Sequence, residues 1–404
     1  MAAAPMIGAE LLLAVTAALI SAGGAELALH RRNLARIPIR VHVNGTRGKS
    51  SVTRLIAAAL REAKIVTCAK TTGTLARMIL PDGRELPIFR PAGANIIEQR
   101  RIVAAAAAHG ARALVVECMA LQPELQSLSE FKMVRATHAV ITNARPDHLD
   151  VMGPTEADVA WALAGMVPVG GKLYTAERQH LGIFEAVARD RGSEIVAISP
   201  EDTERVTSED LARFSHTEHP DNVALALRVC ADLGVEREIA LSGMWKTRPD
   251  PGALFAYRLH YFGREVVFYN AFAANDPVST RQLWELALAR HPDHQQRIAV
   301  FNCRADRPDR SLQLGGEFGS WSSADFVVLM GTGTYLFGRA AADAGFDATR
   351  LIFVEGLGVE EIFERILSLI DRSAVIIGMG NIGGLGLPLV RYFKNRAPPE
   401  SLPS

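Results

Sequence analysis

A glycine-rich segment that ends in a lysine and a serine could bind phosphate groups. It spans residues 44–50, with the sequence NGTRGKS, between an expected strand at Arg40–Val43 and an expected helix at Ser51–Leu60. Such a turn points backbone N–H groups at one spot before a helix N-terminus, where the helix dipole also favours an anion. Lys49 would add positive charge beside the β- and γ-phosphates of a nucleotide, and the Ser50 hydroxyl could hold Mg²⁺. The spacing predicts a phosphate loop of the short form GxxGKS, and the alternative is a chance glycine turn.

Two further side chains follow expected strands. The run Ala113–Glu117 ends in Glu117, and the run Ala139–Thr142 leads to His148. Because ligands gather at the carboxyl ends of parallel strands, Ser50, Glu117 and His148 could converge as ligands of Mg²⁺. Mg²⁺ prefers oxygen, so the histidine is the less expected member of the set. The alternatives are a surface carboxylate for Glu117 and a loop or helix-capping histidine for His148.

The elements that position these residues follow an α/β pattern. From Arg40 onward, short β-branched runs alternate with helical patterns, which is typical of a parallel sheet covered on both faces. Pro249, Pro251 and Gly252 interrupt the alternation, so we place a domain boundary between residues 245 and 246. We expect a hydrophobic helix at 1–36, a phosphate-binding domain at 37–245, a smaller α/β domain at 246–396 that opens with a hairpin, and a loose tail at 397–404.

Composition excludes several classes of protein. Of the 404 residues, 44 are Lys or Arg and 44 are Asp or Glu, and this balance lacks the basic surplus of a nucleic-acid-binding protein. Apolar residues make up 49% of the chain, which excludes wholesale disorder. The 4 cysteines are far apart and form no CxxC pair, which excludes a zinc ribbon or dithiol motif and fits a reducing compartment.

The N-terminal segment is long and apolar enough to meet a membrane. Leu11–Ala25 carries no charge, and the longer stretch Met6–Leu29 could span a hydrocarbon layer of about 30 Å as a helix. No Lys or Arg precedes it, so we do not expect a cleaved secretory signal. By the positive-inside rule, the arginines that follow predict a protein anchored at the cytoplasmic face of the cell membrane: Arg31, Arg32, Arg36 and Arg40. The alternative is a buried core helix.

Together, these motifs resemble those of a known superfamily. GxxGKS after a strand, a Glu at the end of a later strand and NxxPDHLD further on resemble the Mur ligase/folylpolyglutamate synthase superfamily. Segments throughout the chain are similar to the ligase-subunit (PgsB/CapB) family of poly-γ-glutamate synthases, among them HVNGTRGKSSVTRLIAAALREA, TNARPDHLDVMG, YNAFAANDPVST and IIGMGNIGGLGLPLVRYF. The resemblance implies a P-loop Mur-ligase-like central domain and a smaller Rossmann-like C-terminal α/β domain, preceded by the hydrophobic helix.

The resemblance also implies an activity. ATP would phosphorylate a glutamate γ-carboxylate, and the amine of another glutamate would attack the acyl phosphate, releasing ADP and phosphate and building poly-γ-glutamate for a capsule or exopolymer. ATP and Mg²⁺ are the implied cofactors. A small integral-membrane partner and export or capsule components (PgsC/PgsA-like) are the implied partners, because a polymer made inside must leave the cell. A folylpolyglutamate-type synthase and a non-catalytic ATP-dependent scaffold of capsule assembly are the alternatives.

The family's functional residues fall on matching positions of this sequence. The resemblance implies that Lys49, Glu117 and His148 are catalytic, that Ser50, Glu117 and His148 hold metal, and that the nucleotide contacts are Gly45, Thr46, Gly48, Lys49, Ser50, Asn222 and Asn275. The alternative for Asn222 is a helix N-cap. The alternative for Asn275 is a helix that starts at the following Asp276-Pro277.

Two departures from the superfamily limit these expectations. The helix expected at Glu156–Met166 contains no lysine, and Lys172 lies beyond it, so we do not expect the carbamylated lysine that bridges a second metal in Mur ligases. Only 44 residues precede Gly45, too few for a UDP-sugar domain, so a UDP-muropeptide substrate is not expected.

Overall fold

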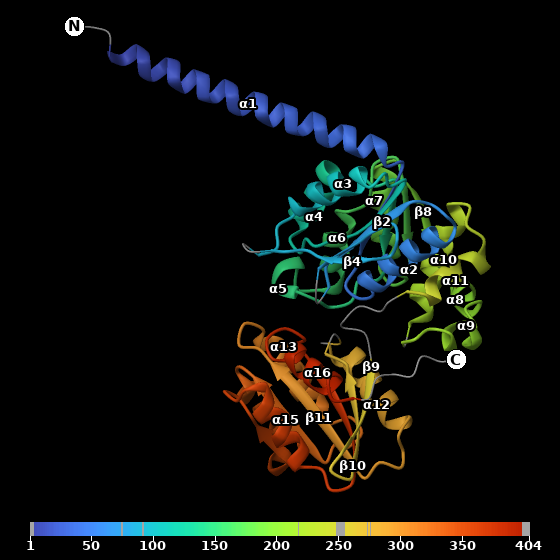
Figure 1. The fold of residues 1–404 in the computed structure, drawn as a ribbon, viewed down its shortest axis with the longest axis vertical. Helices are drawn as coiled ribbons and strands as arrows, with labels where there is room; N and C mark the ends of the chain where they lie inside the picture. Colours follow the sequence, from blue (N-terminus) through green and yellow to red (C-terminus); the bar gives the residue numbers. More distant parts are fainter. Residues whose placement is uncertain are drawn as a thin grey trace. The chain divides into compact units, whose positions relative to one another are not determined.

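The computed structural model of this protein describes residues 4–73, 76–90, 93–216, 218–247, 255–272, 274 and 276–397. The chain divides into two compact units, Met1–Arg248 and Pro249–Ser404 (Figure 1). The boundary predicted between residues 245 and 246 lies just before this division. The two units are described separately below.

The first unit is built on a mixed sheet with the phosphate-loop strand β1 near its middle. The strand order is β4-β3-β2-β5-β1-β6-β7-β8. Since β5 and β6 run parallel to β1 on either side, all three carboxyl ends open at the same edge of the sheet. The strands are β1 (Ile39–Asn44), β2 (Thr67–Thr71), β3 (Arg77–Ile79), β4 (Glu85–Pro87), β5 (Ala113–Glu117), β6 (His138–Ile141), β7 (Lys172–Thr175) and β8 (Glu194–Ala197).

Helices cover both faces of this sheet. Val41 and Val43 of β1 pack in one buried cluster with side chains of α2, α10 and α11. Ile141 of β6 packs in another with α6 and α7. The helices are α1 (Ala4–Arg36), α2 (Lys49–Glu62), α3 (Glu98–Ala108), α4 (Pro123–Leu128), the π-helix η1 (Ser129–Val134), α5 (Leu149–Met152), α6 (Glu156–Ala164), α7 (Leu181–Asp190), α8 (Pro200–Glu204), α9 (Ser208–Ala212), α10 (Pro220–Asp232) and α11 (Arg237–Trp245).

The sheet departs from the expected parallel arrangement at its outer strands β3 and β4. β3 pairs antiparallel with both β2 and β4. The reason is the length of the connections, because a parallel crossover needs a dozen or more residues and these strands follow one another after only a few. The fold class is otherwise the predicted one, an α/β protein with helices on both sheet faces.

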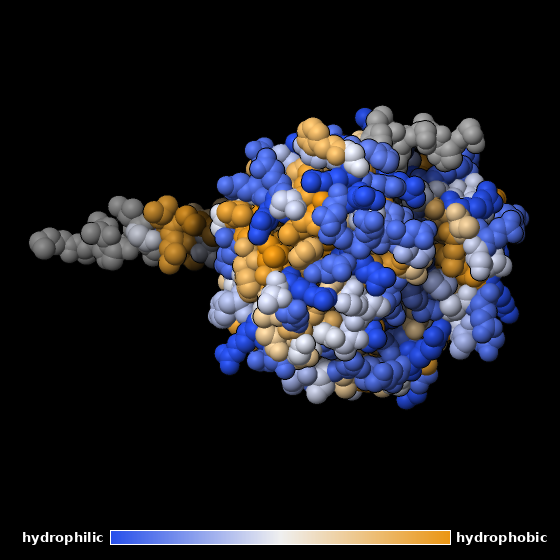
Figure 2. Space-filling model, turned by 90° about the horizontal axis from the view of Figure 1, so that it is seen from below, coloured by the Kyte–Doolittle hydropathy of each residue, from blue (hydrophilic) through white to orange (hydrophobic). Residues whose placement is uncertain are grey.

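The N-terminal hydrophobic helix is α1, and its side chains from Glu10 to Leu29 are exposed. This exposure excludes the buried core helix that the sequence left as an alternative. Within the described residues, Glu10–Arg36 is a stretch long and apolar enough to cross a membrane, with mean hydropathy 1.8. Figure 2 shows the visible, non-grey part of this helix as largely apolar.

The second unit is a smaller α/β domain around a second sheet, in the order β13-β12-β11-β14-β10-β9. Its first two strands form the predicted hairpin, and the other pairs are parallel. Alternate residues of β10 face opposite cores: Val267 packs with α12, α13 and α14, and Val266 packs with α15 and α16. The elements are β9 (Phe255–Tyr261), β10 (Arg264–Asn270), α12 (Pro277–Ala289), β11 (Gln296–Cys303), α13 (Pro308–Phe318), β12 (Phe326–Gly331), α14 (Thr334–Asp343), the 3-10 helix η2 (Ala348–Arg350), β13 (Leu351–Phe353), α15 (Val359–Ser368), β14 (Ser373–Gly380) and α16 (Gly386–Lys394).

Candidate active site

The predicted phosphate loop joins β1 to α2, and its geometry requires both of its glycines. Gly45 has φ of 128° and Gly48 has φ of 80°, values that residues with side chains rarely adopt. A Cβ at Gly45 would lie 2.9 Å from the backbone nitrogen of Thr142, and one at Gly48 would lie 2.6 Å from Oδ1 of Asn222. The loop backbone therefore passes so close to its neighbours that a larger residue at either position would displace it.

The phosphate loop is held in place by Asn143, which lies two residues after the end of β6. Asn143 accepts hydrogen bonds from the Thr46 backbone at its carbonyl oxygen (3.0 Å) and from the Thr46 hydroxyl at its side-chain oxygen (2.7 Å). The same side-chain oxygen accepts from the Arg47 backbone (3.1 Å). In this structure the Thr46 side chain thus fixes the loop, and its expected contact with phosphate remains a prediction.

Lys49 is the first residue of α2, and its side chain folds back over the loop. Its Nζ donates to the carbonyl oxygens of Gly45 (2.6 Å) and Thr46 (3.3 Å). The first turn of α2 contains no acidic side chain. The ammonium group and the unpaired N–H groups of a helix N-terminus therefore act on the same small region, which is the arrangement that binds an anion.

Ser50 and Glu117 meet, as the sequence predicted. The Ser50 hydroxyl donates to Oε2 of Glu117 at 2.8 Å, and the backbone N–H of Thr72 donates to the same oxygen at 2.7 Å. Glu117 is only 2% exposed, so it is not the surface carboxylate of the alternative interpretation. The parallel register of β1 and β5 explains the meeting, because Val43 lies directly beside Glu117 just before the loop begins.

Behind Glu117 lies a buried ionic network that the sequence did not reveal. Lys70, fully buried on β2, contacts Oε1 of Glu98 at 2.9 Å and donates to Oε1 of Gln99 at 3.3 Å. Gln99 in turn donates to the backbone oxygen of Glu117, and Arg90 binds both oxygens of Glu98. Burial lowers the pKa of Lys70, and the nearby Glu98 and Glu117 oppose that shift. The network holds β2, α3 and the end of β5 in a fixed arrangement.

His148 lies on the loop after β6, at the same edge of the sheet as the phosphate loop. It occupies the N-cap position of α5 with φ of 48°, so the predicted alternative of a helix-capping position describes its backbone. Its Nε2 is 3.9 Å from Oδ1 of Asp147, and Oδ2 of Asp147 is 3.7 Å from the Arg47 guanidinium. His148 therefore lies beside Asp147, which in turn lies beside Arg47 of the phosphate loop.

Of the three predicted metal ligands, Ser50 and Glu117 suit Mg²⁺ better than His148 does. The Ser50 hydroxyl and the Glu117 carboxylate are hard oxygen ligands, which Mg²⁺ prefers, and they already lie within contact of each other. The His148 imidazole is a poorer match. Over the residues that the structure describes, no group of three or more His, Cys, Asp or Glu side chains is arranged to hold a metal ion. Ser50 and Glu117 thus fit a Mg²⁺ site in which water and phosphate oxygens would supply the remaining ligands.

Asn222 faces the phosphate loop from the first turn of α10, where it is the closest neighbour of a Cβ built at Gly48. The N-cap of this helix is His219 and its first residue is Pro220, so the N-cap alternative for Asn222 is wrong. That Asn222 contacts the nucleotide remains a prediction.

Glu218, which the sequence analysis missed, organises the same corner. Its carboxylate accepts hydrogen bonds from the Asn222 side chain (2.9 Å), the His219 backbone (2.9 Å) and the Ser51 hydroxyl, and His216 lies 3.3 Å away. Burial alone would raise the pKa of Glu218, but these hydrogen bonds outweigh burial and the pKa lies below its usual value. A carboxylate four positions before Asn222, directly ahead of a helix, was the available signal in the sequence.

Two expectations concern residues away from this cluster. Helix α6 contains no lysine, and Lys172 lies at the amino end of β7, where its Nζ is 3.3 Å from both Glu194 and Asp232. The phosphate loop lies at the carboxyl edge of the sheet, so Lys172 is not placed to bridge a metal there. Asn275 lies outside the described residues, and α12 begins after it as the alternative predicted, with Asp276 as N-cap and Pro277 in the first turn.

A glycine-rich loop between a strand and a helix, with Ser50 bonded to Glu117 beside it and Asn222 packed against it, is typical of a phosphate-binding α/β domain. The family model of the Mur ligase middle domain matches residues 43–244. The family model of the poly-gamma-glutamate synthase CapB C-terminal domain matches residues 256–396. The chain belongs to the CapB family of the Mur ligase superfamily.

Individual relatives agree with that family. The chain is 40% identical over 377 residues to the capsule biosynthesis protein CapB of Bacillus anthracis, covering 93% of this chain and 80% of that protein. It is 36% identical over 382 residues to the PGA synthase CapB of Bacillus subtilis (strain 168), covering 94% and 96%. Among solved structures, it resembles the folylpolyglutamate synthase of Mycobacterium tuberculosis complexed with ADP, with a TM-score of 0.69, 18% identity and coverage of 93% and 94%. At that identity the structural likeness establishes the fold alone.

Proposed function

We propose that this protein is the ATP-dependent ligase of a poly-γ-glutamate synthase. It joins glutamates through γ-glutamyl amide bonds by way of a γ-glutamyl phosphate, and it releases ADP and phosphate. The observation that carries the proposal is the phosphate loop with Lys49 over it and Ser50 bonded to Glu117, in a chain that shares 36–40% identity with two CapB proteins.

The chemistry explains the need for a phosphate site. A carboxylate is a poor electrophile, so an oxygen of the γ-carboxylate first attacks the γ-phosphorus of ATP, and the bond to the leaving ADP breaks. The amine nitrogen of a second glutamate then attacks the acyl carbon, phosphate leaves with the bonding electron pair, and the nitrogen loses a proton. Most of the catalytic work in the first step is positioning and stabilisation of charge on the moving phosphoryl group.

The residues of the carboxyl edge supply that stabilisation. The Lys49 ammonium, once released from the carbonyl oxygens of Gly45 and Thr46, binds the phosphate oxygens together with the N–H groups of the first turn of α2. Ser50 and Glu117 would hold Mg²⁺, which when bound would neutralise charge on the β- and γ-phosphates. His148 is a candidate additional ligand. Gly45, Thr46 and Gly48 shape the loop, and Asn222 and Asn275 are proposed nucleotide contacts.

We further propose that α1 anchors the protein in the cell membrane with the two units in the cytoplasm. The helix is exposed, apolar and followed by arginines, the order that the positive-inside rule associates with a cytoplasmic C-terminal body. Residues 37–245 form the proposed ATP-binding domain and residues 246–396 the second ligase domain. A small integral-membrane subunit and export components are the proposed partners, since a cytoplasmic polymer needs a path outward.

Nucleotide turnover by the full chain in detergent or membranes tests the proposal, with and without the small membrane subunit, in the presence of glutamate and Mg²⁺. We expect ADP, phosphate and a γ-linked product to appear together. Lys49→Ala should abolish all three, because it removes the positive charge at the loop. Lys172→Ala is the matched control, because this lysine is on the same sheet at the opposite edge and should leave turnover unchanged.

The other outcomes decide between mechanisms. AMP and pyrophosphate in place of ADP and phosphate would mean adenylation and would rule out the acyl phosphate. ATP binding without glutamate-dependent turnover, even with the membrane subunit present, would indicate the non-catalytic scaffold.

A further inference from the structure

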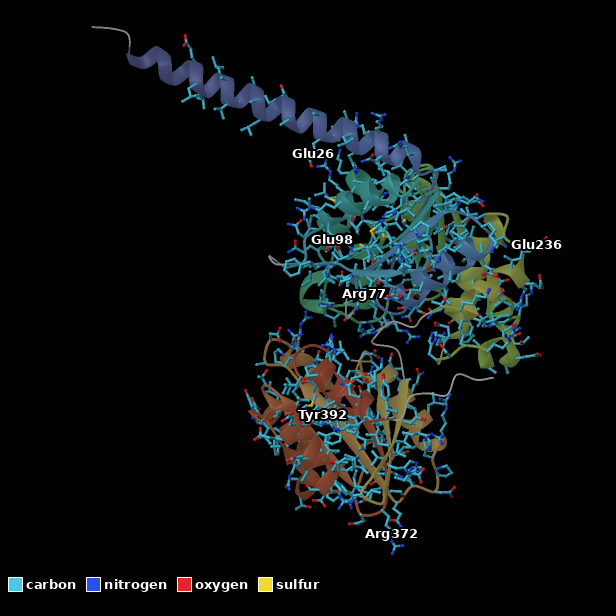
Figure 3. The ribbon with its side chains drawn as sticks, in the orientation of Figure 1. Glu26, Arg77, Glu98, Glu236, Arg372 and Tyr392 are labelled. Atoms are coloured by element: carbon cyan, nitrogen blue, oxygen red, sulfur yellow. The ribbon has the colours of Figure 1, made fainter. Side chains whose placement is uncertain are left out.

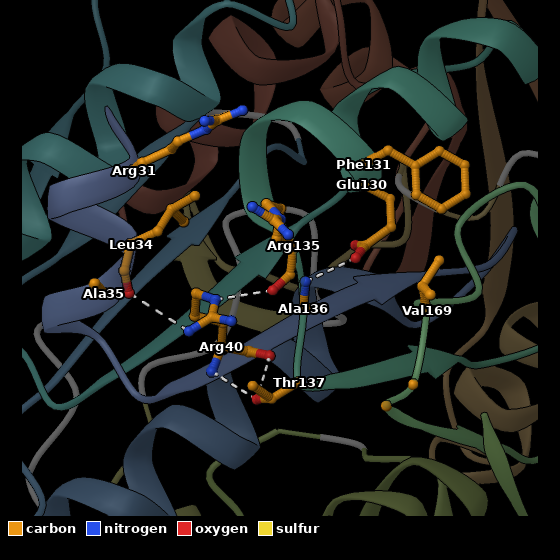
Figure 4. A pocket seen from close by; sticks show the side chains of 12 residues that line it. Arg31, Leu34, Ala35, Arg40, Glu130, Phe131, Arg135, Ala136, Thr137 and Val169 are labelled. Atoms are coloured by element: carbon orange, nitrogen blue, oxygen red, sulfur yellow. Dashed lines mark hydrogen bonds between the residues drawn. The ribbon is translucent and has the colours of Figure 1, made fainter. Parts of the chain in front are cut away.

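The amino edge of the first unit's sheet carries a pocket of about 730 Å³, at the point where α1 meets the domain. Its lining comes from the end of α1, from η1 and the turn after it, from the start of β1 and from the turn before β7. Figure 4 shows Arg31, Arg40 and Arg135 around it, with Phe131 and Val169 on the other side. The pocket lies opposite the carboxyl edge that holds the phosphate loop, so it is separate from the candidate active site.

One of these arginines holds the pocket together. The Arg40 guanidinium donates to the carbonyl oxygens of Ile37 (2.6 Å), Leu34 (3.5 Å) and Arg135 (2.8 Å). It thereby caps the C-terminal carbonyl groups of α1 and ties them to the turn after η1, where a positive charge also complements the helix dipole. Arg40 is therefore a structural residue that fixes the angle at which α1 joins the domain.

The other two arginines have their guanidinium groups available. Arg31 and Arg135 are exposed, and across the described part of the chain neither side chain has a hydrogen bond or ion pair assigned to it. The acidic residue of the lining, Glu130, does not neutralise them, because it is 2% exposed and bonded to His42 (2.8 Å) and to the Ala136 backbone (2.7 Å). The pocket thus presents uncompensated positive charge to whatever enters it.

The position of the pocket along α1 sets the depth at which this charge lies. Arg31 follows the uncharged run that ends at Ala25 by six residues, which corresponds to about 9 Å of helix. The headgroup layer on each side of a bilayer is roughly 5–8 Å thick. Glu26, labelled in Figure 3, pairs with Arg100 of α3 at 2.9 Å, so the domain already contacts α1 just beyond the apolar run. Exposed Val169, at the rim, adds an apolar surface beside the arginines.

We propose that this pocket binds the phosphate of an anionic phospholipid headgroup, with Arg31 and Arg135 as its ligands. The pocket's charge matches the phosphate, and exposed Val169 offers an apolar contact for the acyl chains. Arg31, about 9 Å beyond the uncharged run, lies at the outer boundary of the headgroup layer, and its long side chain can reach back into it. The inference rests on the membrane anchoring proposed above. It adds to that proposal a specific lipid site, which would hold the domain at a fixed height and orientation on the membrane.

The test uses the full chain reconstituted in nanodiscs of phosphatidylcholine with increasing fractions of phosphatidylglycerol, followed by native mass spectrometry of the lipids retained on the protein. We expect preferential retention of phosphatidylglycerol. The double variant Arg31→Gln/Arg135→Gln should lower this preference by at least about thirtyfold, because it removes the charge-assisted hydrogen bonds to the lipid phosphate. Neither residue bonds to the rest of the fold through its side chain, so the variant should remain folded.

A matched variant separates a pocket from general attraction. Arg32→Gln/Arg36→Gln also removes two positive charges, both near the end of α1, but these arginines do not line the pocket. It should keep most of the preference for phosphatidylglycerol. An equal loss in the two double variants would show that the arginines act only as a diffuse positive surface, and the inference would be wrong.

Four further results would overturn the inference. Insertion into phosphatidylcholine without any preference for phosphatidylglycerol would remove the lipid site but leave the anchor intact, whereas failure to insert in any lipid would remove the anchor itself. Retention of inorganic phosphate by Arg31 and Arg135, in place of lipid, would mean a site for a soluble anion. Loss of retained phosphatidylglycerol when the small membrane subunit is added would mean that this subunit, and not lipid, occupies the pocket in the assembled enzyme.

Discussion

The two edges of the first unit's sheet both present positive groups, but they are built in different ways. At the carboxyl edge, the positive region is made by neighbours in sequence: the two loop glycines, the N–H groups of α2 and Lys49. At the amino edge, it is made by arginines that the chain brings together from positions 31, 40 and 135. A backbone site of the first kind is shaped to one group, and a side-chain site of the second kind can adapt to a mobile one.

The acidic residues differ in the same way. At the carboxyl edge, Glu117 accepts from a serine hydroxyl and a backbone N–H, which leaves an oxygen to act as a metal ligand. At the amino edge, Glu130 lines the pocket, but its two carboxylate oxygens are bonded to His42 and to the Ala136 backbone. The difference is that the carboxyl edge retains a carboxylate oxygen that can bind a cation, whereas both carboxylate oxygens of Glu130 at the amino edge are already bonded.

The largest effect should follow from removing the carboxylate at the carboxyl edge. Glu117→Gln keeps the shape of the side chain but lowers its affinity for a divalent cation, so ADP release should fall by about a hundredfold to a thousandfold and need more Mg²⁺. The measurement is glutamate-dependent ADP release against Mg²⁺ concentration. Glu194→Gln, at the amino end of β8, is the control and should follow the wild type. Wild-type turnover with an unchanged Mg²⁺ requirement in Glu117→Gln would remove the proposed distinction between the edges.

The sequence was sufficient to place the phosphate loop because the information for it is local. The strand predicted at Ala113–Glu117 has the observed bounds, and the order of strand, GxxGKS and helix places the loop without knowledge of any distant contact. The meeting of Ser50 with Glu117 needed only the rule that parallel strands end at one edge. Helix α6 was predicted two residues too long, since it ends at Ala164 before the C-cap Gly165.

What the sequence could not provide were contacts between distant positions and elements of minimal length. Glu218 bonds to Ser51 across 167 positions, and the arginines of the pocket meet only after the sheet has formed. β3 and β4 have three residues each, too few for an alternating pattern to be recognised. The network around Lys70 was missed because a lysine inside a strand gives no sign of being buried.

The ion pair beneath the amino-edge pocket should give a pH dependence of stability. Burial lowers the pKa of His42, but contacts with Cys118 and Glu130 outweigh it and raise the pKa from 6.5 to about 9. The protonated form therefore contributes stability that is fully present below pH 6.5 and is lost as the pH rises toward 9. We expect the wild type to lose on the order of 2–3 kcal/mol of unfolding free energy over this interval, and His42→Gln to lose much less.

Denaturant unfolding of the full chain in detergent at pH 6 and pH 9 measures this difference. His109→Gln, which changes an exposed histidine at the end of α3, should keep the wild-type pH profile. Parallel profiles for wild type and His42→Gln would show that Glu130 is not held by a charged histidine, and the account of the pocket's positive charge would need revision.

Glu218 should show the opposite pH dependence at the carboxyl edge. Because its pKa in the folded protein lies below the usual 4.5, the carboxylate contributes stability that is present above that pH and lost as the pH falls through the folded value. Glu218→Gln should cost about 1–3 kcal/mol at neutral pH, since Ser51 and Asn222 lose a charged acceptor, and should flatten the acid limb of the stability curve. The exposed Glu236 provides the control variant Glu236→Gln. An unchanged acid limb in Glu218→Gln would mean that this carboxylate is not ionised in the fold.

The smallest effect concerns the two roles assigned to arginines within one pocket. Arg40→Gln removes hydrogen bonds to Ile37 and Arg135 and should lower the unfolding free energy by about 1–3 kcal/mol. Arg31→Gln removes no such bond and should change it by less than about 0.5 kcal/mol. Thermal unfolding of the two variants in the same neutral detergent measures both. A large loss of unfolding free energy in Arg31→Gln would show that this side chain stabilises the fold. It would then not be available to bind an anion, and the contrast between the two edges would fail.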